Sequence, residues 1–162
     1  MRIGTGGTPT VSTQDRWYAE VRAGRAYHRG TTVAPAAAEF GEIQLLNPAA
    51  SGVNIIVKHT ISNLGVAGQI QCREFSTALL TLAGLGANLL FGGAAGLGAV
   101  RTAVPLAADG TLVSTYAAAT SPATVPIPDW FYELGPGEGI LFVAGTVGIS
   151  IACAYHWIEL PV

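Results

Sequence analysis

The sequence predicts an all-β fold: an antiparallel β-sandwich of jelly-roll type with an extended N-terminal arm. Two observations carry this prediction. Residues 147–157 alternate between large and small side chains, which is the period of a pleated strand with two different faces. Elsewhere, roughly eight short apolar segments are separated by turn signals about every 8–12 residues, a spacing typical of sandwiches and jelly rolls. A chain of 162 residues is long enough for one such domain with a full core.

The first 30 residues are predicted to form the extended arm, and residues 31–162 the sandwich domain. Five of the seven arginines lie in the arm against two acids, whereas three cations face eight acids in the domain. The arm is therefore net positive and the domain net negative. Such an arm is either solvated or docked on an acidic neighbour, for which a second copy of the domain is one candidate. Its candidate contact residues are Arg16, Trp17, Arg22, Arg25, Tyr27 and Arg29.

The domain begins with strand candidates in which apolar residues alternate with polar ones. In residues 68–75, for example, Ile70 and Cys72 point to one face and the polar residues between them to the other. The first three candidates are expected to form an antiparallel meander with one wet face. The proline-rich residues 121–130 suit an edge or a corner. In chain order the candidates are residues 40–47, 53–62, 68–75, 99–104, 111–118, 121–130 and three strands within 131–160.

Residues 76–98 fit two structures. Residues 78–85 could form a short helix, which Gly84 and Gly86 would end, or the whole stretch could cross between the sheets as Greek-key topologies require. No charged residue occurs in residues 75–100, which raises the question of a membrane span. Six glycines, an asparagine and the lack of a flanking basic cluster or aromatic belt argue against one.

The whole chain is poor in charge. Charged residues make up 11% of it, against about 25% in a typical soluble domain. A soluble monomer usually carries more charge than this to stay dispersed. The shortage therefore predicts an obligate subunit that covers much of its surface with partners. Nucleic acid is not an expected partner, because the arginines come without an aromatic platform or a known motif.

No catalytic, cofactor-binding or metal site is predicted. His156 and Glu159 are three residues apart on a strand, so they point to opposite faces and do not share a metal ion. His59 alternates with apolar residues and is expected in the core or in an interface. The glycine cluster at residues 92–98 lacks the Lys-Ser/Thr end of a phosphate loop and indicates close packing instead.

The two cysteines offer no nucleophile. Cys72 and Cys153 both fall on the apolar face of a predicted strand. They are expected to be reduced and buried, and to pack like small apolar side chains. No G-x-S-x-G motif, which marks the nucleophile of many hydrolases, occurs in the chain.

Some residues suit carbohydrate as a ligand. Trp130 is the best candidate for an exposed aromatic ring that stacks on a glycan. The carboxylate pairs Glu39 with Glu42 and Asp129 with Glu133 could serve a glycosidase in principle. Because no open, aromatic-lined groove follows from the sequence, an enzyme ranks below both a structural protein and a binding module.

Three segments, QLLNPAASG at 44–52, ELGPGEGILFVAGT at 133–146 and YHWIEL at 155–160, flank a middle rich in Gly, Ala and Leu. In this arrangement residues 25–160 resemble the small jelly-roll virion structural proteins of tailed bacteriophages. The resemblance implies a subunit displayed on a phage particle, often as a symmetric oligomer.

From this resemblance we expect a non-enzymatic structural protein without a cofactor, with head decoration or cement as its leading role. Its expected partners are further copies of itself, with a trimer favoured, and other virion proteins such as the major capsid protein. Neither nucleic acid nor a membrane is expected. The expected location is the virion, assembled in the host cytoplasm. The alternative is a tail, collar or baseplate jelly-roll module that binds host-surface glycan.

Overall fold

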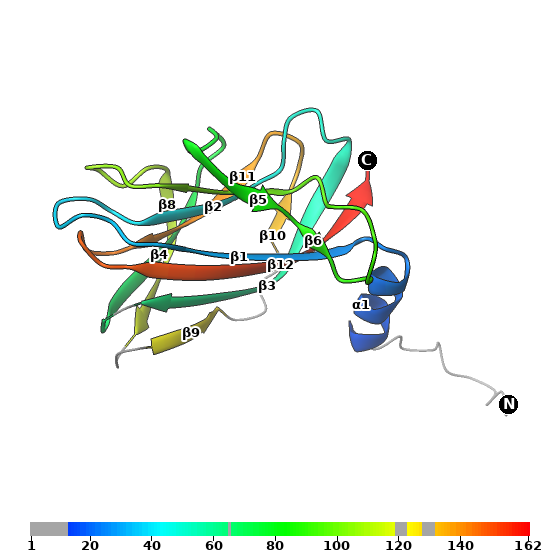
Figure 1. Ribbon diagram of the computed structural model, residues 1–162, viewed down its shortest axis with the longest axis horizontal. Coiled ribbons are helices and arrows are strands. Elements are labelled where there is room, and N and C mark those ends of the chain that lie inside the picture. The colour runs from blue at the N-terminus through cyan, green and yellow to red at the C-terminus, as the bar shows by residue number, and fades with distance from the viewer. Residues whose placement is uncertain (1–12, 65, 119–122, 128–131) are drawn as a thin grey trace, which may run out of the picture.

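The computed structural model describes residues 13–64, 66–118, 123–127 and 132–162; within these ranges, residues 13–16, 58–64, 118 and 123–127 are described by their backbone alone. Two antiparallel sheets pack face to face, and a ten-residue helix lies at one end of the sandwich (Figure 1). The elements are α1 (Thr13–Arg22), β1 (Ala26–Val33), β2 (Glu42–Leu46), β3 (Val53–Leu64), β4 (Gly68–Glu74), β5 (Thr81–Leu85), β6 (Ala87–Asn88), β7 (Ala99–Ala103), β8 (Thr111–Ala118), β9 (Ala123–Ile127), β10 (Tyr132–Leu134), β11 (Gly139–Ala144) and β12 (Ile151–Pro161).

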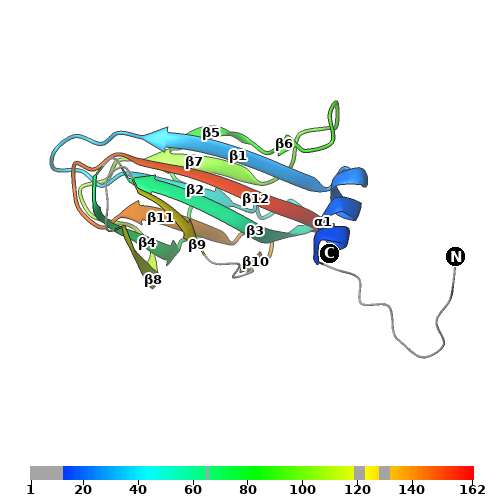
Figure 2. The same ribbon diagram turned by 90° about the horizontal axis from the view of Figure 1, so that it is seen from below.

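The strand order is that of a jelly roll. Sheet A contains β10-β3-β12-β1-β6 in spatial order, with β9 also paired to β3, and sheet B contains β5-β7-β2-β11-β4-β8 (Figure 2). β1 pairs with β12, β2 with β11, β3 with both β9 and β10, and β4 with β8. These are the pairings of one long hairpin rolled into two sheets, which is the jelly-roll arrangement. The predicted antiparallel sandwich is confirmed.

Strand β12 carries the alternation that the sequence predicted. Ile151, Cys153, Tyr155 and Trp157 are buried in the core between the sheets, while the residues between them are half-buried on the outer face of sheet A. The Tyr155 hydroxyl donates a 2.7 Å hydrogen bond to the carbonyl oxygen of Ile43. This bond joins the two sheets through the core.

The expected meander of the first three body strands is wrong. β2 and β4 flank β11 in sheet B, whereas β3 lies beside β12 in sheet A. A strand with one apolar and one polar face shows the same pattern whether its partner is the next strand in the chain or a distant one. Periodicity therefore revealed the strands and not their neighbours.

Of the two structures considered for residues 76–98, the helix over residues 78–85 is not formed, because this stretch contains strand β5. β5 pairs with β7 at the edge of sheet B, and β6 pairs with β1 at the edge of sheet A, so the stretch does cross between the sheets. A glycine allows the crossing: a Cβ atom at Gly86 would collide with the Trp157 ring. We name residues 76–98 the insertion, because they add strand β5 to sheet B and strand β6 to sheet A beyond the strands of the jelly roll.

The N-terminal segment differs from the expected extended arm. Residues 13–22 form helix α1, and residues 26–33 form β1, which pairs along its whole length with β12. The boundary expected between residues 30 and 31 thus falls inside a strand of sheet A. The charge of the segment suggested an arm, but charge does not report the backbone pairing that places β1 in the sheet.

Two loops cover part of the outer face of sheet B. One is the start of the insertion, whose Leu79 packs on β11. The other is the segment 104–110, which we name the strap. Beneath these loops, Glu42 and Gln44 of β2 are fully buried, and Gln44 exchanges hydrogen bonds with the backbone of residues 75–79. The alternation of β2 predicted a solvent-exposed outer face for this strand, but the two loops cover that face and exclude solvent from it.

Candidate assembly surface

The insertion exposes a group of large apolar side chains. Phe91 is fully exposed, and Leu80 is 91% exposed. No charged residue between residues 75 and 100 interrupts the group. Single exposed apolar residues are normal, whereas contiguous apolar patches mark interaction sites, so the concentration of these residues in one segment makes that segment a candidate. We name the group the apolar edge; its members are Leu80, Leu82, Leu85, Leu90, Phe91 and Leu97.

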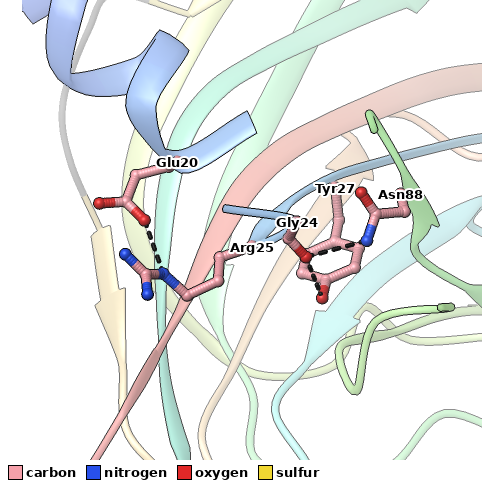
Figure 3. A network of polar contacts seen from close by, with 5 residues as sticks. All are labelled: Glu20, Gly24, Arg25, Tyr27 and Asn88. Carbon is pink, nitrogen blue, oxygen red and sulfur yellow. Dashed lines mark hydrogen bonds and ion pairs between the residues drawn. The ribbon is translucent and has the colours of Figure 1, made fainter. Parts of the chain in front are cut away.

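Asn88 fastens the loop that carries Phe91. Its side-chain amide donates hydrogen bonds to the carbonyl oxygens of Gly24 (2.9 Å) and Ala94 (3.1 Å), and its oxygen accepts one from the N–H of Leu90 (2.8 Å). One side chain thus closes the loop on itself and ties it to the chain that follows helix α1 (Figure 3). The exposed residues of the loop are therefore presented on a fixed backbone.

Glu159 of β12 holds the far end of the same loop. Its Oε1 atom accepts hydrogen bonds from the N–H groups of Leu97 (2.8 Å) and Gly98 (2.9 Å) and from the indole N–H of Trp157 (3.0 Å). The residue is 5% exposed. These three donors replace the water that an exposed carboxylate would bind. A Cβ atom at Gly96 would lie 2.8 Å from the same oxygen, so the loop packs closely against it.

Helix α1 ends in a glycine cap beside this loop. Gly24 has a φ of 70°, and the N–H of Arg25 bonds to the carbonyl oxygen of Glu20 at 3.0 Å. This is a Schellman cap, which needs a left-handed residue at the position of Gly24. The Gly24 carbonyl accepts hydrogen bonds from both the Tyr27 hydroxyl (2.9 Å) and Asn88 (Figure 3). The helix, β1 and the insertion therefore meet at one backbone oxygen.

The helix end also presents positive charge. The Nε atom of Arg25 lies 2.7 Å from a carboxylate oxygen of Glu20, and this hydrogen bond raises the pKa of Arg25. The guanidinium carbon of Arg22 lies 5.6 Å from the centroid of the Tyr18 ring, within cation–π distance. Exposed pairs of this kind add little to stability. Their effect is to hold the arginine side chains in set directions.

Four of the six expected contact residues lie on helix α1 or directly after it. Arg22 and Arg25 are exposed, and Trp17 is half-buried. Arg16 belongs to α1, but the structure describes only its backbone. The end of helix α1 contacts the insertion through the hydrogen bond between Gly24 and Asn88.

Tyr27 and Arg29 are placed differently from this expectation. Tyr27 is 8% exposed and packs on Trp157 with ring centroids 6.1 Å apart. Burial, with the nearby charge of Glu159, raises the pKa of the Tyr27 hydroxyl. Arg29 is half-buried and donates a 2.7 Å hydrogen bond to the carbonyl oxygen of Ala83 in β5. Both side chains make contacts within the chain, because they occupy alternate positions of β1 that do not face solvent.

A cavity of about 300 Å³ opens beside β10. Three carboxylates, those of Glu74, Glu133 and Glu138, line it together with Tyr132. Burial raises the pKa of the Tyr132 hydroxyl, which keeps it neutral. Trp130, the residue expected to stack on a glycan, lies outside the described residues.

The carboxylates considered for a glycosidase serve separate contacts. Glu39 accepts a 3.0 Å hydrogen bond from the backbone N–H of Ala36. Glu42 is buried beneath the strap, and its Oε1 atom accepts a 2.7 Å hydrogen bond from the N–H of Asp109. Asp129 lies outside the described residues.

The cysteines match the expectation. Cys72 and Cys153 are buried and form no disulfide, and burial raises the pKa of the Cys72 thiol, which disfavours the reactive thiolate. Among the side chains that the structure describes, no three from His, Cys, Asp and Glu are grouped to hold a metal ion. In the described part of the chain, no helix has the length and apolar character needed to cross a membrane.

Sequence reasoning did not single out Phe91 or Asn88, and it considered Glu159 only as a metal partner of His156. A signal for Phe91 existed in the charge-free run of residues 75–100. The roles of Asn88 and Glu159 depend on contacts with residues about 60 positions away, which no linear pattern displays.

Comparison with known proteins finds no matching family, curated protein or solved structure. The features that characterise this chain are its jelly-roll topology and the apolar edge fastened beside helix α1.

Proposed function

We propose that this chain is a non-enzymatic structural subunit of a tailed-phage virion, with head decoration or cement as its leading role. The subunits associate with one another, for which we propose a trimer, and bind other virion proteins such as the major capsid protein. In this role the protein acts in the virion, after assembly in the host cytoplasm, and needs no cofactor.

The apolar edge carries this proposal. Fully burying one large apolar side chain contributes about 1.5–3 kcal/mol, so the group as a whole favours association strongly before its entropic costs. Asn88 and Glu159 fix the loop that bears Phe91, which lowers the ordering cost of binding. A surface of this kind suits a permanent contact between subunits.

Two further features support the proposal. Jelly rolls are a common architecture of viral capsid domains, although they also occur in lectins and other proteins. The exposed Arg22 offers positive charge to an acidic neighbour from the end of helix α1, which contacts the insertion through Gly24 and Asn88. The net negative sandwich domain of a second copy has the complementary sign.

The test is the molar mass of the purified full-length protein, measured by analytical ultracentrifugation over a range of concentrations. We expect a trimer whose dissociation is promoted by Phe91→Asp, because a charge on the fixed loop must then be buried in the contact. Binding to phage particles that lack the protein should weaken in parallel.

Leu112→Asp is the matched control. Leu112 is a half-exposed leucine on β8, at the edge of sheet B opposite β5, outside the apolar edge. The control should leave the molar mass unchanged. A wild-type protein that stays monomeric at every concentration and does not bind particles would contradict the proposal.

The cavity beside β10 favours a second candidate function. Carboxylates and a tyrosine lining a cavity of about 300 Å³ can hydrogen-bond and stack on a sugar, as a host-binding tail, collar or baseplate module requires. Binding of the isolated protein to a glycan array, lost in both Trp130→Ala and Glu133→Gln, would support this function. An array without any bound glycan would exclude it for the sugars tested.

A further inference from the structure

The three histidines of the chain lie in one row across sheet A. His28 of β1 is the register partner of His156 in β12, and His156 is the register partner of His59 in β3. The three residues are far apart in sequence. The row exists only because the jelly-roll topology makes their strands neighbours.

An irregularity in strand pairing creates the row. Between His156 and Trp157 the register with β3 shifts, so that Trp157 pairs with Val57 while His156 pairs with His59. Lys58 is the extra residue on β3. The alternation that grouped His59 with Val57 in the sequence does not continue through such a bulge.

The two described rings of the row already contact each other. The ring centroids of His28 and His156 are 6.0 Å apart, and the ring planes are inclined by 24°. His28 is exposed and His156 is half-buried, so a dissolved ion can reach the pair. The adjacent outward-facing row holds Gly30 and Ala154, whose small size leaves room beside the rings.

We propose that this row binds one divalent transition-metal ion through the imidazoles of His28 and His156. Imidazole is a preferred ligand of zinc, nickel and copper. At zinc–nitrogen distances of about 2.0–2.1 Å, two rings that share an ion have centroids roughly 5–6 Å apart. The observed separation therefore needs only small side-chain rotations, and water completes the coordination.

The metal site uses none of the side chains of the apolar edge. The insertion nevertheless borders the row, because Ala87 of β6 is the register partner of His28. An ion held by His28 and His156 joins β1 to β12. Binding should therefore raise the thermal unfolding midpoint of the protein, because the ion binds only the folded chain.

The test is a titration of the full-length protein with zinc chloride, followed by isothermal calorimetry. We expect one ion per chain. His28→Ala or His156→Ala should weaken binding at least about tenfold, because even changes to residues that only orient metal ligands cost 10–100-fold in affinity. The triple variant with His59→Ala has no imidazole left and should bind no zinc.

Matched controls separate metal binding from folding. Thr32→Ala changes another exposed residue of β1 and should leave the affinity unchanged. His28→Gln keeps the approximate size of the side chain and should weaken binding like His28→Ala. Circular dichroism without zinc should show every variant folded. The proposal is overturned if the wild-type protein takes up no zinc, or if the triple variant binds zinc as tightly as the wild type.

Discussion

Asp109 donates its backbone N–H to the Oε1 atom of Glu42 at 2.7 Å, and this contact closes the strap over the outer face of sheet B. Arg73 holds the same segment from the other side through 3.0 Å hydrogen bonds to the carbonyl oxygens of Asp109 and Gly110. Glu42 is fully buried, and its Oε2 atom has no hydrogen-bond partner among the described residues. Burial raises the pKa of Glu42 to about 7, with the Asp109 hydrogen bond and the charge of Arg73 acting in the opposite direction.

Stability should therefore fall as the pH rises from about 4.5 to above 7. Glu42 has a pKa of 4.5 in an unfolded chain and about 7 when folded, so the folded state retains its proton longer. Its stabilising effect is complete below the unfolded pKa and is lost as the pH rises through the folded one. The loss approaches at most about 3 kcal/mol.

Urea unfolding of the wild type and of Glu42→Gln across this pH range checks the prediction. The glutamine variant keeps the shape of the side chain without an ionisable group, so its stability should depend less on pH. Curves of equal slope for the two proteins would show that Glu42 does not titrate in this range.

Asn88→Ala should loosen the loop that carries Phe91. The substitution removes the bonds to Gly24 and Ala94 and leaves the N–H of Leu90 without its partner. We expect a loss of about 1–3 kcal/mol in stability and faster hydrogen exchange of the amides in residues 89–97, measured by mass spectrometry.

Asn54→Ala is the control for this change. Asn54 makes one exposed hydrogen bond, to Glu133, so its loss should leave both stability and the exchange of residues 89–97 nearly unchanged. Equal exchange in the two variants would mean that Asn88 does not fasten the loop.

Gly86→Ala should destabilise the sandwich by about 1–3 kcal/mol, the usual cost of overpacking a core. The added methyl group would meet the Trp157 ring where β5 passes to β6. Gly135→Ala is the comparison, because its nearest contact is a flexible oxygen of Glu138 at 3.4 Å. The thermal unfolding midpoint of Gly86→Ala should be well below that of Gly135→Ala. Equal midpoints would contradict the close packing of Gly86 against the Trp157 ring.

Removal of residues 1–22 should leave a folded sandwich, whereas removal of residues 1–30 should not. The shorter deletion ends before β1. The longer one removes Ala26 to Gly30, which pair with β12 and include the buried Tyr27. Cooperative thermal unfolding and resistance to proteolysis distinguish the two outcomes. Cooperative unfolding of the 31–162 fragment would support the boundary between residues 30 and 31 that the sequence predicted.

The strands and their faces could be predicted from the sequence because a half-buried strand records its own environment in its own residues. The alternation from Ile151 to Trp157 is the clearest case. The outer face of β2 could not be predicted, because Gln44 and Glu42 are buried by loops that come from residues 75–80 and 104–110. A covered polar residue and a solvated one look the same in a linear pattern.

Two features of the sequence pointed to a surface that partners cover. The low charge of the whole chain predicted such a surface without placing it, and the arginine-rich segment predicted a positive contact. The contact between the arginine-rich segment and the insertion could not be predicted. It depends on the hydrogen bond from Asn88 to the Gly24 carbonyl, and these two residues are far apart in the sequence. The sequence also could not show that Tyr27 and Arg29, which the charge pattern grouped with the contact residues, lie on the inward-facing side of β1.

The pairing of β1 with β12 sets an order of events during synthesis of the chain. Ala26 is among the first residues of sheet A to be made, and its register partner Ile158 is among the last. One side of β1 must remain without its β12 partner until residues 151–158 have been made, so sheet A closes late. Folding that depends on such distant contacts is slow, and the waiting strand is open to wrong partners meanwhile.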